Sequence, residues 1–182
     1  LVPPVVTAQP LGGAVIEGEG MVFNVTAGGT EPLTYQWYYG GTPLAGETGS
    51  SLVIGSVTAA NRGGYELQVS NAAGVVKSEV AQLDVLIKPS FVVEPKGGEV
   101  IEGGAYRFGV LASGTAPLSY RWLKDGQEIE GAVSQAELFI IGASVSDAGS
   151  YTVVVSNAAG SVSSEGAGLE VLVPPMIVVA PE

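Results

Sequence analysis

The chain has 182 residues, with 18 acidic and 7 basic side chains, no histidine and no cysteine. The absence of cysteine excludes disulfides, thiolate nucleophiles and cysteine-ligated metals. The absence of histidine excludes imidazole general bases and histidine-ligated metals. A net charge of −11 repels phosphate backbones and anionic lipid surfaces, so nucleic acid is not an expected partner.

The composition predicts an all-β protein. Hydrophobic residues make up 46% of the chain and charged residues only 14%, which is low for a globular protein. Valine and glycine are each more frequent than any of the helix-forming residues Glu, Leu and Lys. No apolar run reaches the roughly 18–20 residues that a membrane helix needs, so no membrane insertion is expected in this segment.

An internal repeat organises the chain. Trp37 recurs as Trp122 and Tyr65 as Tyr151, each in a similar local sequence, and the opening Leu-Val-Pro-Pro returns near the end. The expected divisions are one domain over residues 1–87, a second over 88–173, and a last segment over 174–182. That last segment is either the opening strand of a third repeat or a strand that pairs with another subunit.

In each repeat, alternating apolar and polar residues between turn residues predict about seven short strands. Those recognised in the first repeat cover residues 21–27, 33–39, 51–56, 64–70 and 75–86. Those recognised in the second repeat cover residues 106–112, 118–124, 137–141, 150–156 and 161–172. Between two alternating runs, Asp125-Gly126 predicts a two-residue hairpin turn, because both residues tolerate positive φ.

Alternation of apolar and polar residues assigns the inward faces. Trp37 shares its face with Leu33 and Tyr35, and Tyr65 shares its face with Leu67 and Val69. The second repeat follows the same pattern. The expected core signature is therefore Trp37, Tyr65, Trp122 and Tyr151.

A core tryptophan opposite a Tyr-x-apolar-x-apolar strand resembles the immunoglobulin sandwich. The stretch from Asp147 to Tyr151 looks like the tyrosine corner of that fold, and residues 61–65 are a version with Asn in place of Asp. The Val-Ser-Asn-Ala-Ala-Gly motif of both repeats is similar to intermediate-set domains. The resemblance covers essentially the whole chain and implies two tandem immunoglobulin-like β-sandwiches, but it names no ligand.

The resemblance also implies where an inter-sheet disulfide would fall. The positions are Val25 and Leu67 in the first repeat and Val110 and Val153 in the second, and all four are aliphatic. Losing such a disulfide costs about 2–5 kcal/mol, which burial of an aliphatic side chain, at roughly 1.5–3 kcal/mol, offsets in part. Cysteine-free domains of this kind resemble the repeats of large bacterial surface and secreted proteins, which implies an extracellular or cell-surface location in a bacterium.

Carboxylate pairs are the one catalytic option left without His or Cys. Glu128 and Glu130 lie beside the Asp125-Gly126 turn, which indicates a solvated hairpin rather than a glycosidase cleft. The aspartates Asp84, Asp125 and Asp147 are too widely separated for a calcium loop. No phosphate loop or dinucleotide fingerprint is present. We therefore expect no enzyme, no metal and no cofactor.

Four side chains are candidates for an interface. Tyr38 and its neighbour Tyr39 could bind a sugar, and Leu123 with Val154, its expected neighbour across the sheet, could contact another copy. Ordinary scattered surface residues are the alternative in both cases. The candidate segment for strand addition is Met176, Ile177, Val178 and Val179.

These expectations favour a non-catalytic structural or adhesive repeat module of a bacterial extracellular protein or filament. Proline at each junction stiffens the chain, so the module would act as a semi-rigid spacer rising roughly 35–45 Å per domain. Its partners would be other copies or neighbouring repeats. The alternative is a module that binds carbohydrate or protein, such as a glycan or a host or cell-surface protein, through an outer sheet face or hairpin loops.

Overall fold

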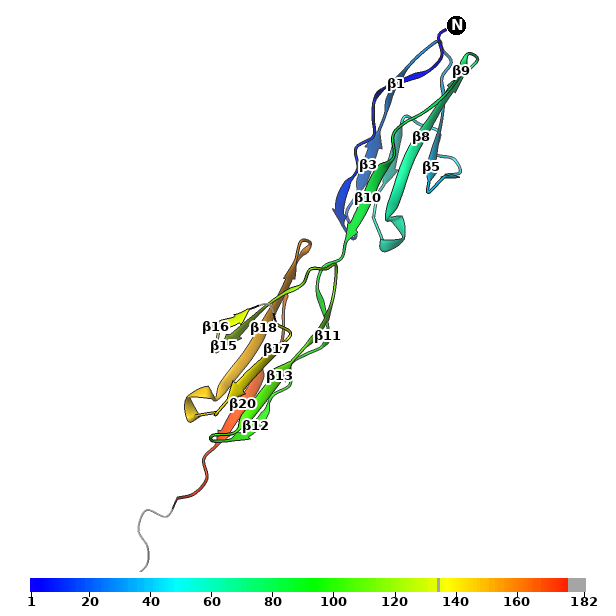
Figure 1. The fold of residues 1–182 in the computed structure, drawn as a ribbon. Coiled ribbons are helices and arrows are strands. Elements are labelled where there is room, and N and C mark those ends of the chain that lie inside the picture. Colours follow the sequence, from blue (N-terminus) through cyan, green and yellow to red (C-terminus); the bar gives the residue numbers. More distant parts are fainter. Residues whose placement is uncertain (134, 177–182) are drawn as a thin grey trace, which may run out of the picture. The chain divides into compact units, whose positions relative to one another are not determined.

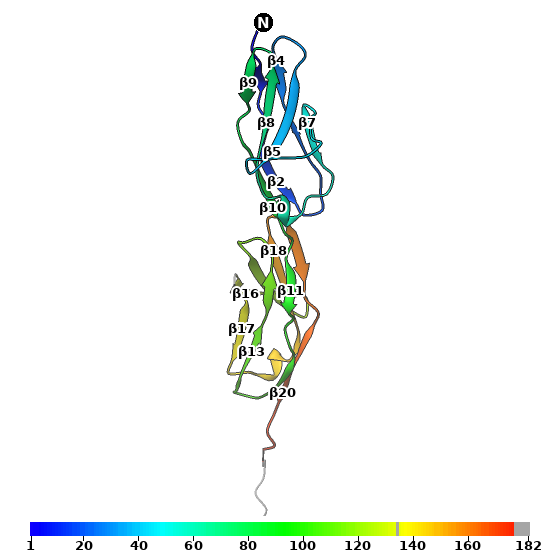
Figure 2. The ribbon, with the colours of Figure 1, turned by 90° about the vertical axis from the view of Figure 1, so that its right-hand side faces the viewer.

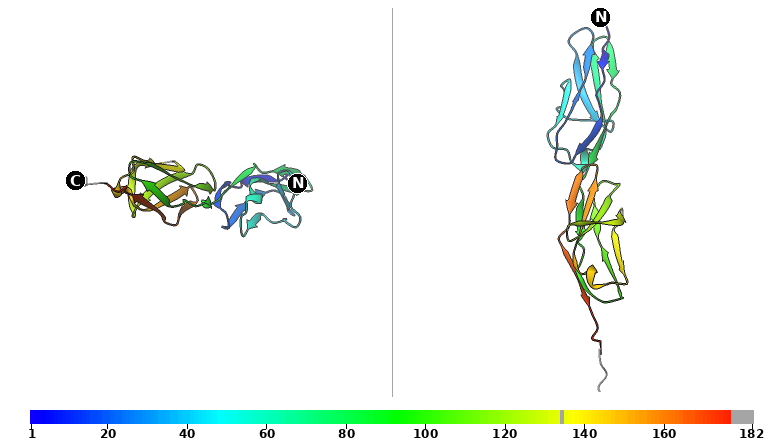
Figure 3. Two further views of the ribbon diagram at one scale, coloured as in Figure 1. Left: turned by 90° about the horizontal axis from the view of Figure 1, so that it is seen from below. Right: turned by 90° about the vertical axis from the view of Figure 1, so that its left-hand side faces the viewer.

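The computed structural model describes residues 1–133 and 135–176, and in these residues it is built of strands with two short 3-10 helices, η1 (Ala59–Asn61) and η2 (Val145–Asp147) (Figure 1). The chain divides into two compact units, of which the first is Leu1–Ile87 and the second begins at Lys88. Each unit has two layers of strands, which Figure 3 shows from two further directions. The predicted all-β class is confirmed.

The larger sheet of the first unit has six strands in the order β2-β10-β8-β5-β6, with β9 also paired to β8. Its strands are β2 (Gly13–Ile16), β5 (Thr34–Tyr39), β6 (Thr42–Pro43), β8 (Gly63–Asn71), β9 (Gly74–Lys77) and β10 (Ala81–Leu86). The opposite layer pairs β1 (Val5–Ala8) with β4 (Thr26–Gly28) and β3 (Met21–Asn24) with β7 (Ser51–Ile54). The pairing of β2 with β10 is parallel, and the other pairs are antiparallel.

The second unit repeats this topology. Its larger sheet has the order β12-β20-β18-β15-β16, with β19 paired to β18. The strands of that sheet are β12 (Gly98–Ile101), β15 (Ser119–Lys124), β16 (Gln127–Val133), β18 (Gly149–Asn157), β19 (Gly160–Ser163) and β20 (Ala167–Leu172). The opposite layer pairs β11 (Ser90–Val93) with β14 (Leu111–Ser113) and β13 (Ala105–Gly109) with β17 (Glu137–Ile141).

Four predicted strands are each two strands in the structure. Val25 lies between β3, which pairs with β7, and β4, which pairs with β1, so residues 21–27 are divided where the chain changes its partner strand. Val110 divides residues 106–112 in the same way, between β13, which pairs with β17, and β14, which pairs with β11. The predicted strands 75–86 and 161–172 are divided at a buried serine, Ser78 or Ser164. Alternation continues across these breaks, so periodicity alone does not show them.

The short strands β1, β2, β11 and β12 at the start of each unit were missing from the predicted strands. They have four residues each and lie at the ends of the sheet orders. Proline and glycine flank them, and most of their side chains are exposed. The alternation that marks a half-buried strand is therefore weak there.

The core of each unit is an aromatic cluster that joins the two layers. In the first unit Phe23 on β3 stacks on Tyr65 of β8, with ring centroids 4.8 Å apart, and lies 6.1 Å from Trp37 of β5. In the second unit Phe108 lies 4.5 Å from Tyr151 and 6.0 Å from Trp122. These side chains are at most 3% exposed, so the four signature residues and two phenylalanines lie within the cores, which buried aliphatic side chains complete.

Three of the four positions of the missing disulfides are also buried. Val25 is 5% exposed, and Leu67 and Val153 are fully buried. Val110 is partly buried and packs against the core of the second unit. Aliphatic contacts therefore occupy the space that the resemblance assigned to cystine.

Candidate functional site

Both units contain the tyrosine corner that the sequence predicted. The Tyr65 hydroxyl donates to Asn61 O (2.9 Å), and the Tyr151 hydroxyl donates to Asp147 O (2.8 Å). Each bond connects a core ring to the 3-10 helix that precedes its strand. Burial raises the pKa of Tyr65, and the neighbouring Tyr39 raises it further. Burial also raises the pKa of Tyr151, and the nearby Asp147 adds to this increase. The corners are structural parts, because both hydroxyls are engaged within the fold.

The side chains at the start of each corner also cap the 3-10 helix. Asn61 Oδ1 accepts from the backbone N–H and the hydroxyl of Thr58, at 2.8 and 2.9 Å. Asp147 Oδ2 accepts from the same two groups of Ser144, both at 2.8 Å. These bonds to Ser144, the backbone bond foremost, hold the pKa of Asp147 below the ordinary aspartate value. The two corners therefore share one geometry but differ in charge.

Two buried serines were missed by the sequence analysis. Ser78 Oγ accepts from Leu67 N (2.9 Å) and donates to Glu79 O (2.8 Å). Ser164 Oγ accepts from Val153 N (2.9 Å) and donates to Glu165 O (2.9 Å). Each serine thus satisfies the backbone of a position that would carry cysteine in a disulfide-bonded relative. The recurrence of Ser-Glu at the same place in both repeats was the available signal.

The Asn-Ala-Ala-Gly motif forms a hairpin loop, and in the first unit its asparagine also hydrogen-bonds to the start of the chain. Asn71 Nδ2 donates to Val2 O and Thr30 O, both at 2.9 Å, while Asn71 Oδ1 accepts from Ala73 N (2.8 Å). Asn157 in the second unit donates to Thr115 O (2.8 Å) and accepts from Ala159 N (2.8 Å). The Asn71 amide therefore links three segments that are distant in sequence, and the Asn157 amide links its own loop to the segment at Thr115.

The Asp125-Gly126 turn has the predicted hairpin geometry. Asp125 and Gly126 have φ of 50° and 81°, and Asp125 Oδ1 accepts from Ser150 N (2.8 Å). The pKa of Asp125 is lowered, mainly by this bond from Ser150 and then by Lys124. Glu128 lies 3.6 Å from Arg121 in an exposed ion pair. Among the described residues no group of three or more carboxylates is arranged to hold a metal ion.

Leu123 and Val154 lie on neighbouring strands but are not direct partners. Leu123 on β15 pairs with Thr152 of β18, and Val154 pairs with Arg121, so the two expected neighbours lie diagonally across the strand pair rather than directly opposite each other. The two side chains are diagonal neighbours and both are half-buried. A hollow beside them is lined by Ser119, Tyr120, Arg121, Val154, Ser156 and Ser161.

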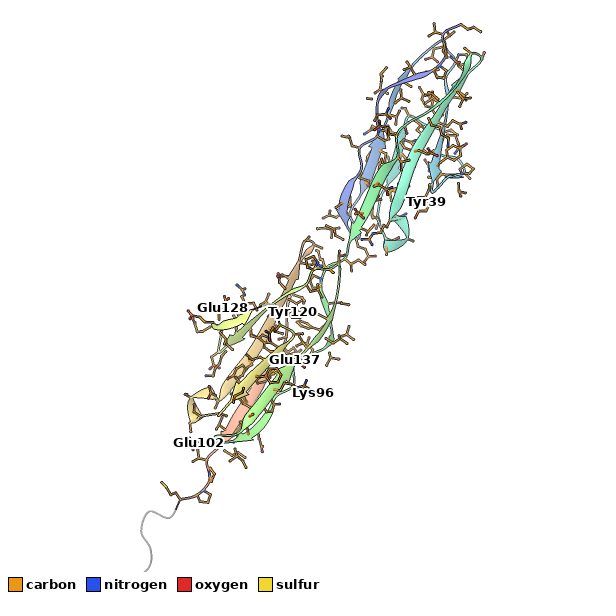
Figure 4. The ribbon with its side chains drawn as sticks, viewed as in Figure 1. Tyr39, Lys96, Glu102, Tyr120, Glu128 and Glu137 are labelled. Atoms are coloured by element: carbon orange, nitrogen blue, oxygen red, sulfur yellow. The ribbon has the colours of Figure 1, made fainter. Side chains whose placement is uncertain are left out.

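Tyr38 and Tyr39 are in different environments. The Lys77 Nζ lies 4.8 Å from the centre of the Tyr38 ring and 2.6 Å from Glu66, so an ion pair covers this ring. Tyr39 packs on Tyr65 with ring centroids 4.9 Å apart. Its hydroxyl lies 3.0 and 2.8 Å from the carbonyls of Ala60 and Arg62, beside η1 (Figure 4). Neither ring is therefore an open platform for a sugar.

The candidate strand-addition segment is described only at its first residue. Met176 is exposed, whereas Ile177, Val178 and Val179 lie outside the described residues. A search of the described residues finds no helix long and apolar enough to cross a membrane.

Known families match both units. The profile of the immunoglobulin I-set domain matches residues 89–171, and that of an immunoglobulin domain matches residues 3–71. The solved I-band fragment I67–I69 of titin shares 27% identity with a TM-score of 0.81, covering 96% of this chain and 67% of that one. The predicted pair of immunoglobulin-like sandwiches is confirmed.

Among curated proteins the chain is similar to parts of much longer ones. Mouse hemicentin-2 is 34% identical over 172 residues, which is 86% of this chain but 3% of hemicentin-2. The mouse basement membrane-specific heparan sulfate proteoglycan core protein is 32% identical over 149 residues, or 79% of this chain and 4% of that protein. Both are animal proteins, so they lend no support to the bacterial origin that the absence of cysteine implied.

The corner hydroxyl gives a stability prediction. Tyr151→Phe removes the donor to Asp147 O, and we expect a loss of about 1–3 kcal/mol in the free energy of unfolding of the second unit. Chemical denaturation followed by tryptophan fluorescence, compared with the wild type, measures it. Tyr120→Phe is the matched control, because no hydrogen bond of its hydroxyl is found among the described residues. Equal stability of the two variants would contradict the corner's role.

Asp147 predicts acid sensitivity in the second unit. The pKa of Asp147 is lower in the folded state than in the unfolded chain. The ionised carboxylate therefore contributes its full stabilisation to the second unit above the aspartate pKa of the unfolded chain, and this stabilisation is lost as the pH falls through the folded-state pKa. Asp147→Asn should therefore flatten the stability of the second unit against pH between about pH 5 and 2, while its neutral-pH fold is retained. Unfolding of each unit as a function of pH measures this.

The first unit provides the reciprocal control. Asn61 already makes the same pair of bonds without a charge. Asn61→Asp should introduce acid sensitivity there, and an unchanged pH profile in both variants would refute the assignment.

Proposed function

Since this chain consists of two tandem immunoglobulin-like domains, we propose that it is a non-catalytic structural and adhesive module, acting as a semi-rigid spacer with homotypic contacts. The observation that carries the proposal is the shortness of the junction. Strand β10 ends at Leu86 and β11 begins at Ser90, which leaves Ile87, Lys88 and Pro89 between two closed sandwiches. Three residues including a proline allow little backbone freedom.

The location we propose is extracellular or at the cell surface. One relative, the basement membrane-specific heparan sulfate proteoglycan core protein, is by its name a protein of the basement membrane, which supports this choice. A bacterial source and assembly into a filament are finer parts of the proposal. The bacterial source rests on the absence of cysteine in 182 residues, and filament assembly rests on the tandem repeat.

Protein partners fit the surface better than a glycan does. A sugar stacked on Tyr38 would have to displace the Lys77 ammonium that lies over the ring and pairs with Glu66. Leu123 and Val154, in contrast, leave a diagonal pair of half-buried aliphatic side chains on the β15–β18 face. We propose this face for contact with another copy or a neighbouring repeat, and Met176–Val179 as a strand-addition segment or the start of a next repeat.

The spacer role predicts the dimensions of the chain in solution. A folded-over pair of 182 residues would have a radius of gyration of about 16 Å, whereas units about 40 Å apart would give about 23 Å. We expect the larger value by small-angle scattering at low concentration. Lys88→Gly with Pro89→Gly should broaden the distance distribution, and a wild-type value near 16 Å would exclude a spacer.

The homotypic face predicts a charge-sensitive association. Replacing Leu123 and Val154 with lysine should weaken self-association, because two ammonium groups would have to be desolvated on contact. Sedimentation over a concentration series measures this. Val75→Lys, at an exposed position of the other unit, is the control, and association that survives the double substitution would remove this face from the proposal.

A further inference from the structure

Strand β17 is an unprotected edge in the second unit. Among the described strands it pairs only with β13, in the register Arg107 to Phe139 and Phe108 to Leu138 (Figure 2). Its other side carries a row of backbone groups with no ladder partner in the described part of the chain. Such edges are templates for pairing with another strand, and proteins commonly blunt them with lysine, proline or bulges. The five residues Glu-Leu-Phe-Ile-Ile contain none of these protections.

The side chains of β17 make this edge apolar on its outer face. Leu138 is buried and Ile140 packs against the core, whereas Phe139 is 54% exposed and Ile141 is 83% exposed. Val93 and Leu111, in the adjoining pair β11–β14, are exposed as well. An aromatic and an aliphatic residue exposed on one edge strand differ from the scattered surface hydrophobics that need no explanation.

The outer face of β13 and β17 carries both signs of charge, whereas acidic residues dominate the chain as a whole. The hollow beside β13 is lined by Lys96 and Arg107 and by Glu94 and Glu137, two of each sign. Arg107 forms an ion pair with Glu137, and Figure 4 shows Glu137 and Lys96 on this side of the unit. Two copies that each carry a net charge of −11 repel one another. The two basic residues on this face lessen that repulsion, and Glu130 on the free side of β17 adds one further acidic group.

The free side of β17 also has room. A second hollow of about 360 Å³ borders it, lined by residues of β16 and by Glu137, Leu138 and Phe139. The equivalent edge of the first unit differs: β7 has four residues, and Ser51 there donates to Asn24 (2.7 Å). Its exposed apolar residue is Val53, paired with Val22. The two repeats therefore share the edge, but only the second presents an aromatic and an isoleucine on it.

We propose that β17 of one copy pairs antiparallel with β17 of a second copy around a two-fold axis at Phe139. This register matches all five residues of the strand: Phe139 lies opposite its own equivalent, and Glu137 opposite Ile141. On the outer face, Phe139 then lies beside Phe139 of the other copy, and the aliphatic stem of Glu137 lies beside Ile141. No two carboxylates therefore face each other. The isologous contact joins two of the smaller sheets into one continuous layer. It goes beyond the proposed homotypic contact by assigning a different face, opposite to that of Leu123 and Val154.

Sedimentation equilibrium of the full chain tests the pairing. Phe139→Lys with Ile141→Lys should raise the dissociation constant about tenfold or more, since aromatic anchors dominate such contacts. Val53→Lys, on the equivalent strand of the first unit, should leave it unchanged. Thermal unfolding of the double variant should match the wild type, because both replaced side chains are exposed.

A single cysteine tests the register, because the chain has no other. Phe139→Cys should form a covalent dimer on mild oxidation, because equivalent residues at the two-fold axis lie within disulfide reach. Val53→Cys and Leu123→Cys are the controls, and both should remain largely monomeric.

The outcomes separate the inference from the proposed function. A wild-type chain that stays monomeric at high concentration, or Phe139→Cys that crosslinks no faster than Val53→Cys, would overturn the β17 contact. Neither result changes the expected radius of gyration of the spacer. Association lost only with the Leu123 and Val154 double variant would support the other face and refute this one.

Discussion

The contact on which each unit depends is that of one phenylalanine with the tryptophan and tyrosine of the opposite layer. Phe23 meets Trp37 and Tyr65, and Phe108 meets Trp122 and Tyr151. These rings bridge the two sheets where a covalent bond would otherwise act. Aromatic rings bury large areas and prefer defined geometries, so they can fix the distance between layers without cysteine.

The remaining features of the core hold that cluster in place. The tyrosine hydroxyls bind the 3-10 helices, and the indole N–H groups of Trp37 and Trp122 donate to Gly49 O and Gln135 O, both at 3.0 Å. Among the described residues every buried side-chain nitrogen or oxygen has a hydrogen-bond partner. Buried polar groups are costly when unpaired, so these bonds allow polar aromatic residues to occupy the centre of the sandwich.

Much of this fold is predictable from the sequence because the pattern occurs twice. Alternation identified the strands around Trp37 and Tyr65, and the corner motif identified the bond of Tyr151. The breaks at Val25 and Ser78 were not predictable, because a strand can change its partner, or a buried serine can bind the neighbouring backbone, without interrupting alternation. The surface was harder still. Whether Tyr39 faces solvent or Tyr65 depends on packing, and the exposure of Phe139 depends on β17 lying at an edge, which is a property of topology rather than of local sequence.

The absence of any covalent link between the layers has a mechanical consequence. When tension opens a disulfide-bonded sandwich, the cross-link limits how far the chain extends, and a reduced bond must be reoxidised before the native state returns. In this chain the layers are joined only by contacts between side chains and by hydrogen bonds, so an opened unit could release its entire length of about 87 residues. It could then refold without an oxidant, because ring packing and backbone bonding re-form spontaneously in either redox condition.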